Sequence, residues 1–178
     1  MKFSEPLSGL FHLRVEPRLD ERGSFARMFS NAHFQELSLC TDFVEWSQSY
    51  NARAHTLRGL HWQNPPEIKM VHCVRGAIFD VAVDVRQDSP SFGKHYSALL
   101  SAENGESLYI PHGFAHGFQT IEDASTVLYH ISQAYVPEGV RGVRWNDPML
   151  AIGWPNPYSP IMSERDKTLP LLSEIQVT

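Results

Sequence analysis

Residues 77–86 read AIFDVAVDVR, and side-chain character in this stretch repeats with a period of two. Every odd-numbered position is apolar: Ala77, Phe79, Val81, Val83 and Val85. The opposite face carries Asp80 and Asp84. A period of two is typical of a β-strand, because apolar positions on a helix recur every three to four residues. Residues 77–86 are therefore predicted to form a strand.

Short segments of similar character flank this strand on both sides. Turn residues separate them, with Arg75 and Gly76 before the strand and the run 89–93 after it. Further strands are predicted at residues 9–15, 24–29, 43–53, 57–63, 68–74, 96–100, 107–110, 115–122 and 126–135. One short helix is expected around Phe34, with Ser30 or Asn31 as its N-cap, and residues 163–169 provide a single helical turn. So many short strands indicate an all-β sandwich or barrel.

Length and composition predict one globular domain over residues 1–178. The chain has 178 residues, 42% of them hydrophobic and 20% charged, which is ordinary for a folded domain. Five prolines follow residue 146, at positions 148, 155, 157, 160 and 170. Residues 146–178 are therefore expected to form a C-terminal extension packed on the barrel.

Charge and hydropathy exclude several classes of protein. The net charge is -5 and no segment concentrates Lys and Arg, so a nucleic-acid binder is not expected. No apolar run approaches the roughly 20 residues that a membrane span needs. The N-terminus lacks an apolar signal region, and two cysteines do not make a disulfide framework. A cytoplasmic protein is predicted.

Three segments carry the side chains that could perform chemistry: LRGLHWQ at 57–63, YIPHGFAHGF at 109–118 and VLYHISQAY at 127–135. The Pro-x-Gly-x-x-His pattern from Pro111 to His116 resembles the second motif of the cupin superfamily, whose fold is a double-stranded β-helix jelly roll. Many cupins hold a metal through an His-x-His pair, but Trp62 and Gln63 follow His61 here. Since a transition metal normally needs three or four ligands, a metal-free cupin is favoured.

The motifs together resemble the dTDP-4-dehydrorhamnose 3,5-epimerase family. They are RGLHWQ at 58–63, DVAVDVR at 80–86, SPSFG at 89–93 and PHGFAHGF at 111–118, with DERG at 20–23, WNDP at 145–148 and WP at 154–155. The resemblance implies a cofactor-independent isomerase that inverts C3, C5 or both in a nucleoside-diphosphate 4-keto-6-deoxyhexose. It also implies a dTDP-linked substrate of deoxysugar and polysaccharide biosynthesis, and a homodimer.

The resemblance also implies roles for individual residues. His61 corresponds to the catalytic base, Tyr129 to the general acid, Asp166 to the carboxylate paired with the base, and Lys69 to the lysine beside the substrate carbonyl. Substrate contacts are expected from Arg22, Arg58, Gln48, Asn51, His116 and Tyr135. Arg22 would reach the partner subunit's site.

These residue types suit epimerisation beside a ketone. Removal of the C–H proton leaves an enolate, and an imidazole with an ordinary pKa of about 6.5 is a suitable base at neutral pH. A carboxylate such as Asp166 would fix the tautomer of the base, and Lys69 could neutralise the enolate oxygen. Inversion requires reprotonation from the opposite face, which the phenol of Tyr129 could supply.

Each residue also has a structural alternative. His61 could be a hydrogen-bonded strand residue, Tyr129 a core aromatic and Lys69 a solvated charge. Asp166 follows Ser163 by three positions, which is a capping-box pattern. Arg58 and His61 should face opposite sides of a regular strand, and a bulge at Gly59 would bring them together.

Three positions depart from the family pattern. Arg27 stands where the family usually has Glu, Val140 stands where an acidic residue is frequent, and residues 48–51 carry an extra residue compared with the common Gln-x-Asn. The nucleotide, the sugar and the inverted carbon therefore stay open. Two other functions also remain: a metal-dependent cupin that uses His61, His112 and His116, and a catalytically silent module that binds sugar nucleotides.

Overall fold

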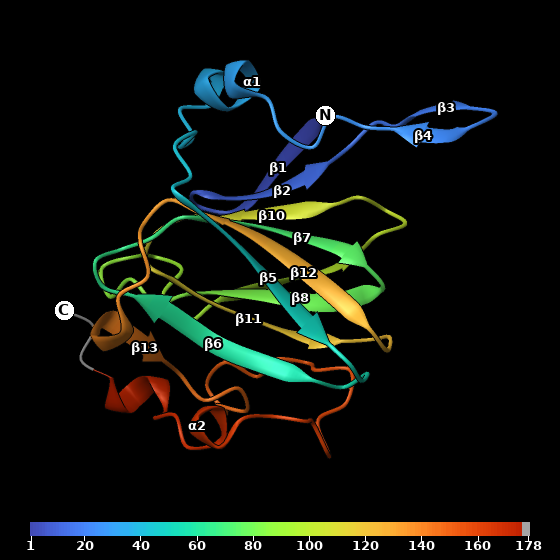
Figure 1. Ribbon diagram of the computed structural model, residues 1–178. Helices are drawn as coiled ribbons and strands as arrows, with labels where there is room; N and C mark the ends of the chain where they lie inside the picture. Colours follow the sequence, from blue (N-terminus) through green and yellow to red (C-terminus); the bar gives the residue numbers. More distant parts are fainter. Residues whose placement is uncertain (176–178) are drawn as a thin grey trace.

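The computed structural model describes residues 1–175, and antiparallel strands are its main secondary structure (Figure 1). The strands are β1 (Lys2–Leu7), β2 (Leu10–Arg14), β3 (Arg18–Asp20), β4 (Gly23–Phe25), β5 (Glu45–Asn51), β6 (Leu57–Gln63), β7 (Lys69–Arg75), β8 (Ala77–Asp84), β9 (His95–Ser101), β10 (Ser107–Ile110), β11 (Phe114–Thr120), β12 (Ser125–Ile131) and β13 (Val140–Gly142). The helices are α1 (Asn31–Glu36) and α2 (Glu164–Lys167), with the 3₁₀ turns η1 (Pro137–Gly139) and η2 (Leu172–Glu174).

Two sheets face each other across a shared interior. One has the order β1-β2-β10-β7-β12-β5, and the other has the order β13-β6-β11-β8-β9. Strands that are distant in sequence lie side by side, such as β2 with β10 and β6 with β11. This arrangement confirms the prediction of an all-β jelly roll with few short helices.

Strand β8 is buried on both faces. Its even-numbered residues Ile78 and Ala82 join the core between the two sheets. Its odd-numbered residues, including Val81 and Val83, meet a second core that the C-terminal segment covers with Leu150, Trp154 and Leu172. In Figure 1 this segment runs beneath the five-stranded sheet. The alternation seen in the sequence therefore separates two buried environments, and Asp80 lies on the interior side.

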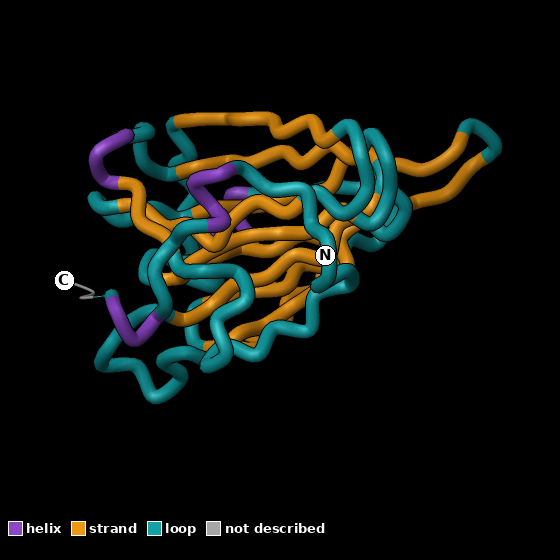
Figure 2. Tube along the Cα trace, turned by 90° about the horizontal axis from the view of Figure 1, so that it is seen from below, coloured by secondary structure: helices purple, strands orange, loops and turns teal. Residues whose placement is uncertain are grey.

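The N-terminal region departs most from the sequence prediction. Strands β1 and β3 were not expected, and β4 is shorter than the predicted segment 24–29. Every residue of β3 and β4 is exposed, so no pattern of burial could mark them. The hairpin they form projects from the body of the molecule (Figures 1 and 2). Leu19 and Phe25 on it are 78% and 74% exposed.

The predicted strand 126–135 ends earlier, at Ile131. The side chain of Gln63 on β6 holds the following segment, because its Nε2 donates to the carbonyl of Ala134 and its Oε1 accepts from the N–H of Val136. Those bonds replace the ladder that a longer strand would have made. They also fix the position of Tyr135, which lies between the two bonded residues.

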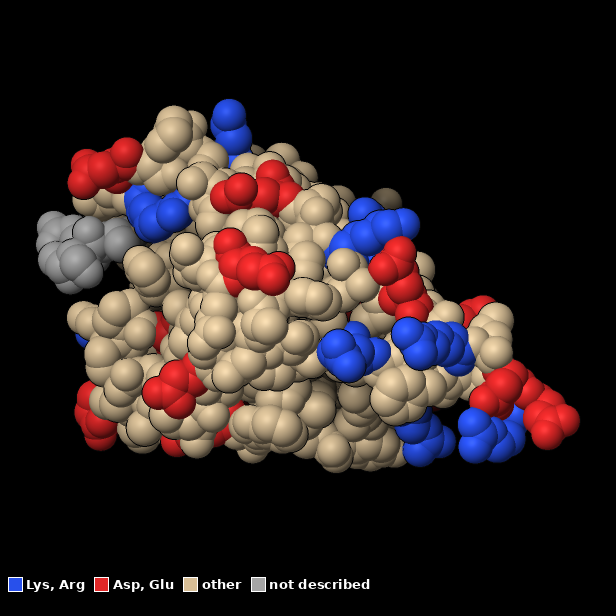
Figure 3. Space-filling model, turned by 90° about the horizontal axis from the view of Figure 1, so that it is seen from above, with Lys and Arg blue, Asp and Glu red and all other residues tan. Residues whose placement is uncertain are grey.

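The surface carries charges of both signs. On the face seen in Figure 3, basic and acidic side chains are interspersed, including at the tip of the β3–β4 hairpin. Within residues 1–175, no helix is both long and apolar enough to cross a bilayer.

Candidate active site

A cavity of ≈ 640 Å³ lies where strands of the two sheets approach the C-terminal segment. Strands β5, β7 and β12 of one sheet and β6 and β11 of the other contribute to its wall. Seven of the ten residues nominated from sequence line it: Arg58, His61, Lys69, His116, Tyr129, Tyr135 and Asp166. These residues come from positions up to 108 apart in the chain, so only the fold brings them together.

His61 and Asp166 form a hydrogen-bonded pair in this cavity. Nε2 of His61 lies 2.7 Å from Oδ1 of Asp166, and Oδ2 of Asp166 accepts from the N–H of Gly59 at 3.1 Å. The His61 side chain is 30% exposed and that of Asp166 is 7% exposed. Burial acts to raise the pKa of Asp166, but hydrogen bonds and the charge interaction with His61 outweigh it and lower that pKa. Because Nε2 is engaged by Asp166, Nδ1 is the nitrogen of His61 that is left to accept a proton.

Helix α2 delivers the carboxylate of Asp166. Ser163 is the N-cap, and its Oγ accepts from the N–H of Asp166 at 3.1 Å. A capping box would also turn the Asp166 side chain back toward Ser163, whereas it reaches His61 and Gly59 instead. The Ser-x-x-Asp pattern thus contributes a cap through Ser163 and a site residue through Asp166.

A bulge at Gly59 brings Arg58 and His61 to the same cavity. Opposite β11, His116 pairs with His61 and Phe118 pairs with Arg58, so β6 contains one extra residue between the two pairs. Gly59 has φ of +120°, and a Cβ there would lie 2.6 Å from the Cα of Gly117. Only glycine fits this conformation and this approach of the two backbones.

Tyr129 lies across the cavity on β12 and packs against the barrel core. Burial raises the pKa of its phenol far above the ordinary value, and the charge of Asp80 raises it further, while Arg58 acts in the opposite direction. Its ring meets the ring of His116 edge to face, with centroids 6.1 Å apart. Tyr129 therefore carries its proton at neutral pH and can act as an acid.

Lys69 lines the cavity with a partner that the sequence analysis missed. Its Nζ lies 2.8 Å from Oε1 of Glu67, and their side chains are only 14% and 11% exposed. Lys69 is therefore not a freely solvated charge. The two residues are separated by one position and both line the cavity, which is the spacing that could have indicated Glu67.

Three nominated residues lie outside the cavity wall. Gln48 is exposed on β5, whose cavity-facing residues are its neighbours Ser47 and Ser49. Asn51 is buried and accepts a hydrogen bond from Nε of Arg58 at 2.8 Å, so it orients that guanidinium. Arg22 lies at the tip of the β3–β4 hairpin, where it pairs with Asp20. Strand parity on β5 was the signal that could have selected Ser47 and Ser49 in place of Gln48.

The alternative metal site requires His61, His112 and His116 to converge. His112 lies in the exposed turn before β11 and does not line the cavity, whereas His61 and His116 are each bonded to a carboxylate. Across residues 1–175 no group of three His, Cys, Asp or Glu side chains is placed to hold a metal ion.

A jelly-roll barrel with a His–Asp pair, a partly buried tyrosine and a lysine around one cavity defines a cupin equipped for acid–base chemistry. Comparison with known proteins agrees with that class. The family model for dTDP-4-dehydrorhamnose 3,5-epimerase matches residues 4–174. The chain belongs to this family.

Individual relatives are similar over nearly their whole length. The dTDP-4-dehydrorhamnose 3,5-epimerase of Sinorhizobium fredii is 42% identical over 168 residues, which cover 92% of this chain and 86% of the relative. The crystal structure of the Bacillus anthracis epimerase with TDP and pyrophosphate bound has a TM-score of 0.90 at 39% identity, covering 94% of this chain and 97% of that one. The structure of the Legionella pneumophila epimerase in complex with dTDP-4-keto-L-rhamnose has a TM-score of 0.91 at 35% identity, covering 98% and 94%.

Proposed function

We propose that this protein is an epimerase that inverts C3, C5 or both in a nucleoside-diphosphate 4-keto-6-deoxyhexose, most simply one linked to dTDP. The observation that carries the proposal is that His61 with Asp166 and Tyr129 line a single cavity. The family and the dTDP-bound relatives support the substrate class. Such a product would serve deoxysugar and polysaccharide biosynthesis.

The mechanism follows from the four proposed catalytic residues. Nδ1 of His61 removes the C–H proton next to the C4 ketone, and Asp166 holds the ring and stabilises the imidazolium that forms. Lys69 stabilises the enolate oxygen, and the carboxylate of Glu67 keeps its ammonium in place. Tyr129 then donates its proton to the other face of the planar carbon, which completes the inversion.

Cationic side chains at the cavity suit an anionic diphosphate. Arg58 and Arg165 both line the wall, and the bond from Arg58 to Asn51 limits the orientations of its guanidinium. Arginine matches phosphate oxygens through paired N–H donors. We assign Arg58 to the diphosphate and Tyr135 to a contact with the substrate along the same wall.

Incubation with dTDP-4-keto-6-deoxyglucose in D₂O tests the function directly. Because each enolate is reprotonated from groups that exchange with solvent, deuterium should enter at every carbon that the enzyme inverts. NMR of the product would show whether C3, C5 or both exchange. Binding of the nucleotide sugar without exchange, for dTDP-, CDP- and GDP-linked forms alike, would instead support the silent binding module.

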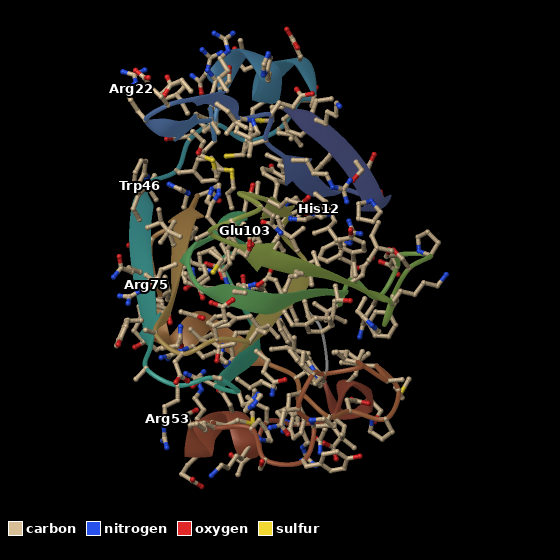
Figure 4. All side chains as sticks on the ribbon, turned by 90° about the vertical axis from the view of Figure 1, so that its right-hand side faces the viewer. His12, Arg22, Trp46, Arg53, Arg75 and Glu103 are labelled. Atoms are coloured by element: carbon tan, nitrogen blue, oxygen red, sulfur yellow. The ribbon has the colours of Figure 1, made fainter. Side chains whose placement is uncertain are left out.

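We also propose that the protein is a homodimer. Strand β5 is an edge of the six-stranded sheet, and its outer face exposes Trp46 by 70% and Tyr50 by 56%. Exposed apolar residues on an edge strand favour association with another chain. Figure 4 shows Arg22 on the hairpin and Trp46 on β5 along the same side of the molecule. A second copy on this side would cover Trp46 and receive the hairpin that carries Arg22.

Light scattering should therefore give about twice the 20.2 kDa mass of the chain at micromolar concentration. Trp46→Glu should shift the protein toward the monomer, because a charge would be buried in the contact. A wild-type mass that stays near that of one chain would contradict the homodimer.

A further inference from the structure

A second His–Asp pair lies beside the first in the same cavity. His116 on β11 is the direct cross-strand partner of His61 on β6. Its Nε2 lies 2.8 Å from Oδ1 of Asp80 on β8. Asp80 is completely buried, and its Oδ2 has no hydrogen-bond partner among the described residues. His116 is only 5% exposed but still reaches the cavity wall.

This geometry gives a buried carboxylate one close partner. A buried charge is costly unless it is paired, so Asp80 depends on its contact with Nε2 of His116. Because Nε2 is engaged with Asp80, Nδ1 is the nitrogen left to exchange protons elsewhere. The ring of Tyr129 meets that of His116 on the cavity wall, with centroids 6.1 Å apart.

The proposed reaction leaves His61 with an extra proton and Tyr129 without its proton. Each inversion moves one proton from the sugar to His61 and one proton from Tyr129 to the sugar. His61 is 30% exposed and can lose its proton to solvent. Tyr129 packs against the barrel core, and burial together with Asp80 raises the pKa of its phenol. The phenolate must therefore regain a proton before another cycle.

We propose that His116, held by Asp80, returns a proton to Tyr129 after each inversion. In this step the N–H bond at Nδ1 of His116 breaks and the O–H bond of Tyr129 forms. His116 is left neutral with its remaining proton on Nε2 toward Asp80, and Nδ1 takes a new proton from water when product leaves. Both residues act through Tyr129 and are positioning residues. The inference rests on the proposed epimerase function. It adds the reset step, which returns Tyr129 to its protonated state before the next inversion.

Asp80→Asn separates this role from a contact with substrate. Asparagine keeps the volume and an acceptor for His116 but removes the carboxylate charge that faces the ring. With enzyme in excess, the rate of the first inversion should stay within about threefold of wild type, because Tyr129 starts protonated. With substrate in excess, a burst of about one equivalent per site should precede a steady rate lower by about 10²-fold, the usual effect of a lost proton donor.

Other results would overturn the proposal. If Asp80→Asn lowers the single-turnover and the multiple-turnover rates equally, Asp80 supports the chemical step itself. If KM rises with kcat unchanged, the His116–Asp80 pair only binds substrate. His116→Gln should reproduce the burst, and the double variant should be no slower than either single one, since both act in one step. This second variant keeps the test valid if Asp80→Asn does not fold.

His72→Gln is the matched control. His72 is also buried, at 3% exposure, but it lines a groove on the outer face of the six-stranded sheet, away from the site. Burial and the neighbouring His130 lower its pKa to about 4, so the substitution removes no charge at neutral pH. It should show no burst. Absence of solvent exchange in the wild-type protein would refute the epimerase function itself, whereas exchange without a burst in Asp80→Asn would refute only the reset step.

Discussion

His61→Ala should abolish both inversion and solvent exchange, with a loss of at least ~10²–10⁴-fold in kcat/KM. His61 is the only proposed base, and Nδ1 is the nitrogen left to accept the proton because Nε2 is bonded to Asp166 at 2.7 Å. His116, the other imidazole that lines the cavity, is the cross-strand neighbour of His61 and is held by Asp80, so we do not expect it to take over proton abstraction. Deuterium incorporation and product formation should therefore fall together.

The activity of Asp166→Asn should lie between that of His61→Ala and that of the wild-type protein. The imidazole would remain, but the charge that stabilises its protonated form would be gone. Since Asp166 also accepts from the N–H of Gly59, melting temperatures must be compared before rates are interpreted. Exchange that persists at the wild-type rate in a folded His61→Ala protein would refute His61 as the base.

Tyr129→Phe should lower inversion by a similar ~10²–10⁴-fold while solvent exchange continues. The enolate can still form through His61, and His61 can return deuterium to the face from which it took the proton. The aromatic ring and its contact with His116 would stay in place, so the loss reports on the hydroxyl. The expected product is labelled substrate of unchanged configuration.

The measurement is NMR of the sugar in D₂O, with isotope content and configuration followed in the same sample. Equal loss of exchange in the Tyr129 and His61 variants, with both proteins folded, would show that the acid is assigned to the wrong residue. His72→Gln again serves as the reference for a buried substitution outside the cavity, and should keep both exchange and inversion.

Local features of the site could be read from the sequence because they depend on neighbouring residues. The period of two in residues 77–86 predicted β8, and the conflict between Arg58 and His61 predicted the bulge that Gly59 makes. Ser163 and its spacing to Asp166 predicted the helix cap. Exposed strands such as β3 gave no signal, since nothing buries one of their faces.

By itself the sequence determined most of the strands, the turns and the motifs that identify the family, because period, glycine conformation and capping act over a few residues. Which face of each strand meets the cavity was decided only by the tertiary structure. Periodicity separates the two faces of β8 but does not say that Asp80 lies inside and reaches His116 on β11. Likewise, the bond between His61 and Asp166 joins residues 105 positions apart. Such contacts depend on how the strands pair and on how the C-terminal segment closes over the sheet, and burial then forces these polar groups to find each other.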